Sequence, residues 1–169
     1  VDTHSNNGDT DMFLTKINAD GSYGYTKTIG GGGGDVAYSI VADSNDNIYF
    51  AGYFSGTNTD FDPSGSVDAH TSNGGTDIFL TKINADGSYG HTQTAGGSAA
   101  DVVSLIGTDS SDNIYLTGYF ASTSVDFDPS LGVDTYTNGN NDGSYDIFLT
   151  KINADASYGY TKAMGGVGY

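Results

Sequence analysis

Cysteine, glutamate, arginine and tryptophan are absent from this sequence of 169 residues, and proline occurs only twice. Without cysteine the chain has no disulfide framework and no thiolate metal site, so its fold must depend on packing, repetition or bound ions. Glutamate and arginine commonly fill helix surfaces, whereas the tyrosine, threonine, isoleucine, valine and phenylalanine that are present favour strands. Together with 26 glycines, this composition predicts an all-β fold.

Positive charge is also scarce. Five lysines stand against 21 aspartates, which leaves a formal net charge of −16. Nucleic acids and anionic membranes repel such a surface unless a basic patch is present, so neither is expected as a partner. No apolar run approaches the roughly 20 residues of a membrane-spanning helix, so no membrane insertion is expected. Cations are the more natural small partners.

One block of the sequence occurs three times. The segment DMFLTKINADG at residues 11–21 returns as DIFLTKINADG at 77–87 and as DIFLTKINADA at 146–156. The first two copies are 66 residues apart and the last two are 69 apart. Similarity at a fixed period of this length indicates a repeat architecture.

Two other blocks recur with the same shift of 66 residues. DSNDNIYFAGYF at residues 43–54 returns as DSSDNIYLTGYF at 109–120, and DFDPS at 60–64 returns at 126–130. The extra residues of the last copy follow its DFDPS block, which marks a loop that tolerates changes in length.

Each period contains four strand signals separated by turn residues. The first two, at residues 37–42 and 48–54, predict a hairpin. The third is expected at 12–18 and again at 78–84. The fourth is expected at 23–29, after an Asp-Gly turn that suits a positive φ. Its threonines and lysine fit an outer edge of a sheet.

Large apolar side chains lie on both faces of the second strand signal. One face carries Ile48, Phe50 and Phe54, and the other carries Tyr49, Ala51 and Tyr53. Burial on both faces is what face-to-face stacking of four-stranded antiparallel sheets requires, as in a β-propeller. A β-solenoid is the alternative, although its rungs usually repeat at about 20–30 residues.

We therefore expect a single propeller domain, or a fragment of one, with about two and a half blades. Residues 1–34 form a half blade, 35–100 a full blade, and 101–169 a full blade plus the start of the next connection. Such a chain cannot close a ring alone. It is expected to be a piece of a longer polypeptide, with any export signal upstream, or to associate with other copies in a homo-oligomer or filament.

The chain resembles the bacterial seven-bladed propeller repeat family known as SBBP. The resemblance rests on the blocks at residues 77–87, 96–101 and 109–118, which keep their order and spacing. One departure concerns the fourth strand, where such repeats often carry tryptophan; this chain has Tyr25, His91 and Tyr160. The resemblance implies a secreted or surface-anchored bacterial protein whose propellers are scaffolds or binding modules. It implies no catalytic residues.

The candidate functional face is the rim that gathers the long connections at residues 55–76 and 121–145. Two pairs of aspartates lie there, Asp60 with Asp62 and Asp126 with Asp128. Each pair places two carboxylates on one side of an extended segment, and Ca²⁺ prefers several such oxygens. The pairs are therefore candidate calcium ligands. The alternative is that they only cap the turn beside proline.

Three weaker signals have structural alternatives. Residues 43–47 and 138–143 resemble the opening of an EF-hand loop but lack its twelfth-position glutamate, so they also fit ordinary Asx turns. His4 and His70 occupy equivalent positions and are candidates for a shared metal site, or for exposed loop positions. The glycines at 30–34 resemble a phosphate cradle but lead into a strand, which favours a flexible connection.

The sequence contains no arrangement of nucleophile, acid and base that predicts catalysis. We expect a non-catalytic extracellular structural or adhesive module, secreted or on the cell surface, with no cofactor other than Ca²⁺. Its partners would be other copies of the repeat and a cell-surface glycan or protein. A calcium- or glycan-binding module of lectin type is the first alternative, and a polysaccharide hydrolase or lyase is the second.

Overall fold

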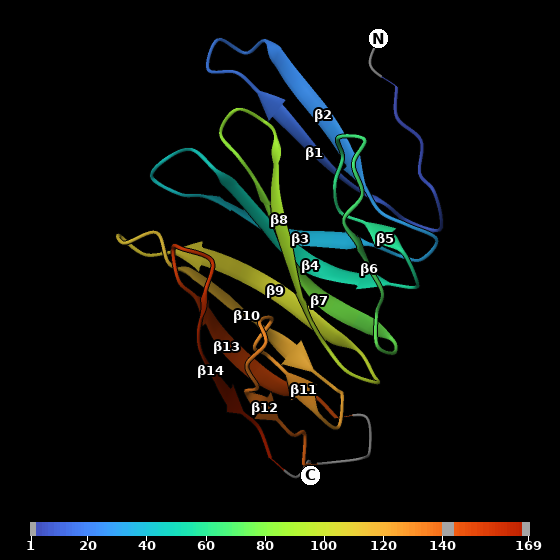
Figure 1. The fold of residues 1–169 in the computed structure, drawn as a ribbon, viewed down its shortest axis with the longest axis vertical. Coiled ribbons are helices and arrows are strands. Elements are labelled where there is room, and N and C mark those ends of the chain that lie inside the picture. Colours follow the sequence, from blue (N-terminus) through green and yellow to red (C-terminus); the bar gives the residue numbers. More distant parts are fainter. Residues whose placement is uncertain (1–2, 140–143, 167–169) are drawn as a thin grey trace.

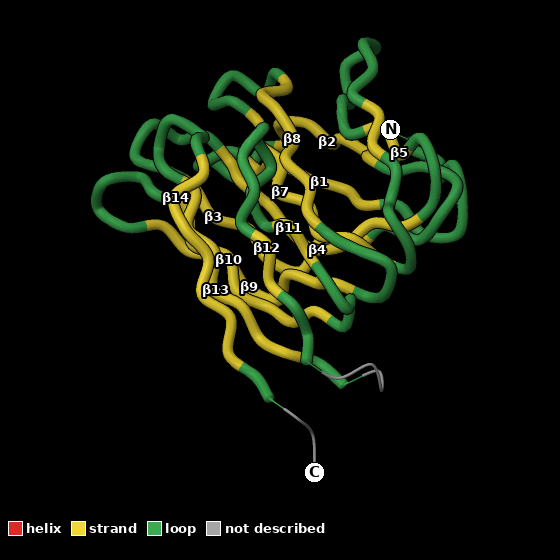
Figure 2. Tube along the Cα trace, turned by 60° about the horizontal axis from the view of Figure 1, so that its bottom comes forward, coloured by secondary structure: helices red, strands yellow, loops and turns green. Residues whose placement is uncertain are grey.

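The computed structural model describes residues 3–139 and 144–166. In these residues all regular structure is β-strand, and loops connect the strands (Figure 2). No helix able to cross a membrane occurs in this part of the chain. The sequence contains β-branched and aromatic residues in short runs between turns, and such runs favour strands over helices.

Three antiparallel sheets follow one another along the longest axis of the molecule (Figure 1). The first sheet consists of β1 (Met12–Ile17) and β2 (Tyr23–Ile29). The second contains, in spatial order, β3 (Val36–Ala42), β4 (Ile48–Ser55), β7 (Thr76–Ile83) and β8 (Tyr89–Ala95). The third contains β9 (Asp101–Thr108), β10 (Ile114–Phe120), β13 (Asp146–Ile152) and β14 (Tyr158–Met164). The all-β prediction with four-stranded antiparallel blades is confirmed.

A small hairpin lies in the connection between the second and third strands of each full sheet. In the second sheet it pairs β5 (Thr59–Asp60) with β6 (Ala69–His70). In the third it pairs β11 (Val125–Asp126) with β12 (Thr135–Tyr136). Each hairpin also touches the preceding sheet, because Gly30 bridges Asp60 and Gly96 bridges Asp126. Each long connection therefore contains a hairpin that links neighbouring sheets.

The stacked sheets bury two separate apolar clusters. Phe50 and Phe54 of β4 belong to the cluster between the first and second sheets. Tyr49 and Ala51 of the same strand belong to the cluster between the second and third. Strand β9 packs against β3, β4 and β7. Burial on both faces of one strand is thus confirmed, and a β-solenoid is excluded because the strands form separate antiparallel sheets instead of successive coils.

The turn between the third and fourth strands has the same geometry in all three sheets. The amide of residue 21 donates to the carbonyl of Asn18 at 2.9 Å, and its counterparts repeat this bond. This position has a positive φ, which is 83° at Gly21, 85° at Gly87 and 67° at Ala156. Glycine adopts this conformation without steric cost, whereas alanine does not. The third copy therefore carries local backbone strain.

Candidate functional site

The predicted calcium ligands lie at the base of the two small hairpins, where each accepts backbone hydrogen bonds. Asp60 Oδ1 accepts from the amides of Asp62 and Asp68, both at 3.0 Å. Asp62 Oδ1 accepts from the amide of Ser64 at 2.8 Å. These bonds fix the turn around Pro63, as the structural alternative expects.

The second hairpin repeats this pattern. Asp126 Oδ1 accepts from the amides of Asp128 at 3.1 Å and Asp134 at 2.9 Å. Asp128 Oδ1 accepts from the amide of Ser130 at 2.9 Å. No group of three or more His, Cys, Asp or Glu side chains that could hold a metal ion occurs in residues 3–139 and 144–166. A role in turn formation is therefore observed, and calcium binding stays a prediction.

The phenylalanine of each DFDPS block is part of the core. Phe61 is fully buried and lies 5.3 Å from the ring of Phe54 and 5.2 Å from that of Phe79, measured between centroids. Phe127 repeats these contacts with Phe120 and Phe148. The sequence interpretation assigned this segment to a surface rim and missed its core role. The signal was present, since an aromatic residue recurs between the two aspartates.

A second set of contacts fastens each hairpin to the outermost strand of its sheet. The hydroxyl of Tyr89 donates to Asp68 Oδ2, and that of Tyr158 donates to Asp134 Oδ2. The pKa of both tyrosines is raised above the usual value of 10.0, mainly by burial and secondly by the adjacent carboxylate. The hydroxyls therefore stay protonated and able to donate.

His70, one of the two histidines predicted for a shared metal site, contacts the first hairpin. His70 lies with Nε2 3.2 Å from Asp68 Oδ1 and with Nδ1 3.2 Å from the hydroxyl of Thr94. His4 makes the equivalent contact with Thr28, also at 3.2 Å. Each histidine thus contacts the outer strand of its own sheet, and a shared metal site stays a prediction.

Buried aspartates occupy the connections between successive sheets. Asp35 accepts from the amides of Gly31 at 2.8 Å and Ser55 at 3.2 Å. Asp101 accepts from the amide of Gly97 at 2.8 Å and from the Ser122 hydroxyl at 2.7 Å. In the glycine-rich segment at 30–34, Gly31 and Gly34 donate backbone hydrogen bonds to Asp35 and Ser55, and its flexibility stays a prediction. In these connections the aspartate carboxylate accepts hydrogen bonds from backbone amides that are not paired with another strand.

Asp77 has the most perturbed carboxyl group among those with a resolved shift. It is 2% exposed, and Oδ2 accepts from the amide of Asn73 at 2.8 Å, while Oδ1 has no hydrogen-bond partner. Burial, with a contribution from the charge of Asp101, raises its pKa to about 6. A Cβ at position 96 would lie 2.3 Å from Cγ of Asp77, so glycine is required there. The sequence alone did not identify this site.

The turns that resemble EF-hand openings are Asx turns. Asp43 Oδ1 accepts from the amides of Asn45 and Asn47, both at 2.9 Å, and Oδ2 accepts from the Asn47 side chain at 2.7 Å. In the equivalent turn, hydrogen bonding by the Asn113 side chain lowers the pKa of Asp109 to about 2. These aspartate oxygens are already engaged by the turn itself. The other segment of this kind, 138–143, lies mostly outside the described residues.

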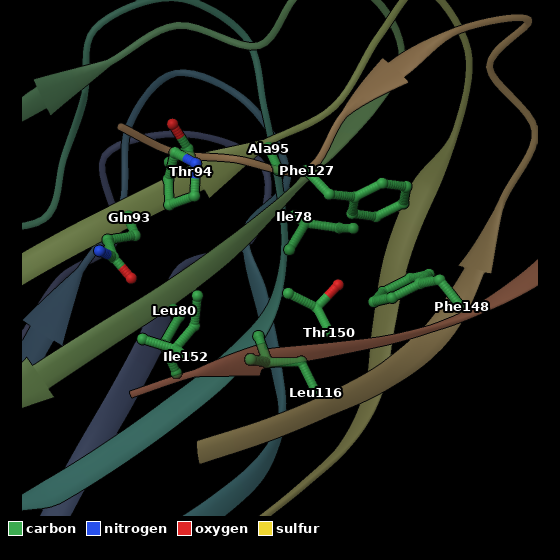
Figure 3. Close-up of a pocket in the computed structure, with 11 residues that line it drawn as sticks. Ile78, Leu80, Gln93, Thr94, Ala95, Leu116, Phe127, Phe148, Thr150 and Ile152 are labelled. Atoms are coloured by element: carbon green, nitrogen blue, oxygen red, sulfur yellow. The ribbon is translucent and has the colours of Figure 1, made fainter. Parts of the chain in front are cut away.

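An apolar cavity of about 30 Å³ lies between the second and third sheets (Figure 3). Ile78 and Leu80 of β7 face Phe148 and Ile152 of β13 across it. Gln93, Thr94 and Thr150 also border it. At this volume the cavity is a packing gap that is too small for an organic ligand.

Comparison with known proteins supports the architecture. No family model matches the chain. The chain is similar to an uncharacterized WD repeat-containing protein, L264, of Acanthamoeba polyphaga mimivirus, with 28% identity over 142 residues. The match covers 79% of this chain and spans about a tenth, 10%, of the length of that protein.

WD repeats form the four-stranded blades of propellers, in agreement with the sheets described above. The chain contains no tryptophan and so lacks the Trp-Asp dipeptide after which such repeats are named. Membership of the bacterial SBBP family stays a prediction. The stacked four-stranded sheets and the similarity to a WD repeat-containing protein together support a propeller-type repeat.

Proposed function

We propose that the chain is a non-catalytic propeller module that acts as a scaffold for adhesion outside the cell or on its surface. The observation that carries this proposal is the repeated presentation of the hairpin tips, residues 63–67 and 129–133, which we call the tip surface. Val67 and Val133 occupy equivalent positions in it and are 74% and 78% exposed, and Leu131 is fully exposed. The residues beneath them are fixed by Asp60, Phe61 and their counterparts.

Rigid presentation of the same apolar group on successive sheets favours multivalent contact. Loops held by a rigid scaffold commonly carry binding function, and linked sites increase avidity without new kinds of contact. The strongly acidic surface limits non-specific attachment to nucleic acids and anionic membranes. The similarity to a WD repeat-containing protein agrees with a scaffold but names no partner.

An adhesion assay tests this function. Beads coated with the chain are mixed with intact bacterial cells and with purified cell-surface polysaccharide, and bound beads are counted. Replacing Val67 and Val133 by serine should lower binding severalfold at an unchanged midpoint of thermal unfolding. Leu105→Ser is the matched control. Leu105 lies on β9 in the third sheet and is 61% exposed, so this variant should bind normally. Beads that bind no better than uncoated beads would contradict the proposal.

Localisation is tested separately, because adhesion requires access to the outside. Antibodies raised against the chain should label intact cells of the source organism without permeabilisation. Labelling that needs permeabilised cells would remove the extracellular part of the proposal. It would leave an intracellular scaffold as the remaining interpretation.

Calcium binding is the second candidate, and one feature favours it. A hollow of about 410 Å³ between the first sheet and the first hairpin is bordered by Asp11, Asp60 and Asp62, although these carboxylates do not converge on one metal position, and Oδ1 of Asp11 has no hydrogen-bond partner. Backbone carbonyls and water would have to complete the coordination of Ca²⁺. Calorimetric titration with CaCl₂ should show saturable heat that Asp60→Asn removes. A thermal midpoint that is the same with Ca²⁺ and with chelator would exclude the ion.

A further inference from the structure

Two tyrosine rings lie side by side on neighbouring strands of the second sheet. The ring centroids of Tyr38 on β3 and Tyr53 on β4 are 5.8 Å apart, and the ring planes are tilted by 59°. The register of these strands shifts between Ala37 and Ser39, so Tyr38 occupies a β-bulge. A bulge re-aims the side chain that it carries. The bulge therefore accounts for the contact between Tyr38 and Tyr53.

The hydroxyl groups of the two rings lie close to each other. The pKa of Tyr53 is raised above its usual value of 10.0, mainly by burial and secondly by the hydroxyl of Tyr38. Electrostatic effects of this kind fall with distance, so the two phenol oxygens lie at the same end of the ring pair. The ring carbons next to these oxygens therefore lie there too.

Solvent reaches this pair of rings. Tyr38 is 56% exposed, and Tyr53 is partly buried. The counterpart of Tyr38 in the next repeat is Ser104 of β9, which is exposed although β3 packs against β9. This position of the repeat therefore stays open to solvent when a complete sheet lies beside it, and a small oxidant can reach Tyr38.

The composition of the chain directs one-electron oxidation to tyrosine. The sequence has 13 tyrosines but no cysteine and no tryptophan. Cysteine thiolates are readily oxidised, and the indole ring of tryptophan also gives up an electron readily. Because both are absent, a one-electron oxidant acts on the tyrosine phenols.

A second close pair of tyrosines shows what distinguishes the first. Tyr119 and Tyr145 have ring centroids 4.8 Å apart. Tyr145 lies in the connection that precedes β13, outside the register that joins β13 to β10. By contrast, Tyr38 and Tyr53 both lie within strands that pair with each other. The sheet itself therefore fixes the spacing of the first pair.

We propose that Tyr38 and Tyr53 form a site of oxidative cross-linking, at which a haem peroxidase and hydrogen peroxide join the two rings as dityrosine. Each phenol first loses one electron and its hydroxyl proton, which gives two phenoxyl radicals. The radicals couple through a carbon–carbon bond between the ring carbons next to oxygen, and the hydrogen on each of these carbons then moves to the phenol oxygen. One hydrogen peroxide takes up the two electrons and two protons and becomes two water molecules.

The sheet favours this bond over links between molecules. Two groups held in contact react as if they were at very high concentration, whereas tyrosines of separate chains must first meet. Torsions about the bond to an aromatic ring are broad, so the rings can turn until their edges meet. The new bond ties β3 to β4 and restricts the unfolded chain, as a disulfide does. This inference goes beyond the proposed adhesion and does not depend on the tip surface.

Treatment of the full chain with peroxidase and hydrogen peroxide at low protein concentration tests the site. The treated protein should remain a monomer on a denaturing gel, show dityrosine fluorescence and be lighter by two hydrogen atoms. A protease that cleaves before aspartate separates residues 35–42, which contain Tyr38, from residues 46–59, which contain Tyr53. Mass spectrometry should find these two peptides joined. If dityrosine joins only other peptides, or if none forms, the proposal is overturned.

Matched variants identify the two rings. Tyr38→Phe and Tyr53→Phe each keep the ring and remove one phenol, so each should abolish the joined peptides while circular dichroism shows an unchanged fold. Tyr49→Phe is the control and should leave the yield unchanged, because Tyr49 shares the 46–59 peptide but is 5% exposed in the cluster between the second and third sheets. Joined peptides that persist in Tyr53→Phe and disappear in Tyr49→Phe would assign the bond to Tyr49 and contradict the proposal.

Discussion

The hydroxyl of Tyr89 donates a hydrogen bond to Oδ2 of Asp68, and this contact joins the outermost strand of the second sheet to the hairpin that folds back over it. The hydroxyl oxygen of Tyr89 also lies 2.9 Å from Thr92 Oγ1, which is placed to donate its own proton to it. The bond spans residues that are far apart in sequence, so it depends on the native arrangement of the hairpin. Tyr158 and Asp134 repeat it in the third sheet.

Replacement of Tyr89 by phenylalanine should lower the free energy of unfolding by about 1–2 kcal/mol, because a hydrogen bond to a carboxylate is lost. Urea denaturation of the variant and the parent measures the difference. Tyr158→Phe should have a similar effect, because Tyr158 makes the equivalent contact in the third sheet. Equal stability of Tyr89→Phe and the parent would show that the hairpin is held by packing alone.

The raised pKa values of Tyr89 and Tyr158 make stability fall in alkali. Because burial, followed by the neighbouring carboxylate, raises each folded-state pKa above 10.0, this stability is fully present below pH 10 and is lost as the pH rises beyond it. Absorbance at the phenolate band and circular dichroism should therefore show tyrosine ionisation coupled to unfolding above pH 10. Ionisation of all tyrosines without loss of structure would contradict this coupling.

Ala156 should be a site where glycine stabilises the protein. Its φ of 67° costs an alanine about 1–2 kcal/mol, so Ala156→Gly should raise the free energy of unfolding by about 1 kcal/mol. Gly21→Ala is the matched reverse change, since a Cβ there would meet nothing within 4 Å and only the backbone cost remains. Thermal and urea unfolding measure both. An unchanged or less stable Ala156→Gly variant would contradict the strain at this turn.

Phe61 should contribute more to stability than its position in a surface connection suggests. Removing a fully buried phenylalanine costs about 3–5 kcal/mol, so Phe61→Ala should unfold the chain at a much lower urea concentration. Phe61→Leu retains most of the volume and keeps the test valid if the alanine variant does not fold. Leu131→Ala, in the exposed tip surface, should be neutral. A neutral Phe61→Ala would mean that the hairpin does not pack as described.

At neutral pH the ionised carboxylate of Asp77 should lower the free energy of unfolding. Burial, with the charge of Asp101, raises its folded-state pKa from 3.8 to about 6. Its contribution is therefore most favourable below pH 3.8 and is lost as the pH rises toward 6.

Asp77→Asn keeps the acceptor for the Asn73 amide and removes the charge, so it should stabilise the chain at pH 7 by up to about 3 kcal/mol. The gain should disappear near pH 4. Urea denaturation at several pH values measures the difference between variant and parent, and the exposed Asp9→Asn change serves as control. A gain that does not vary with pH would exclude titration of Asp77 as the cause.

The sequence by itself determined the repeat, the strands and the sheets. The predicted strands at 12–18 and 23–29 agree with β1 and β2 within one residue, because alternation and turn residues act locally. The two opposite faces of residues 48–54 were also readable, and they entered the two clusters as predicted. These features depend on residues that are close in sequence, and the repeat shows each of them more than once.

Tertiary structure alone decided the roles of the long connections. The fold-back of the hairpins places Phe61 in the core and leaves Val67 in solvent, although both belong to one polar connection. Likewise, Asp77 is buried, which raises its pKa to about 6, whereas Asp60 caps a turn. These differences arise from contacts between residues that are distant in sequence, such as Tyr89 with Asp68. The free energy of such contacts depends on how deeply the groups are buried, and a local sequence pattern does not determine that burial.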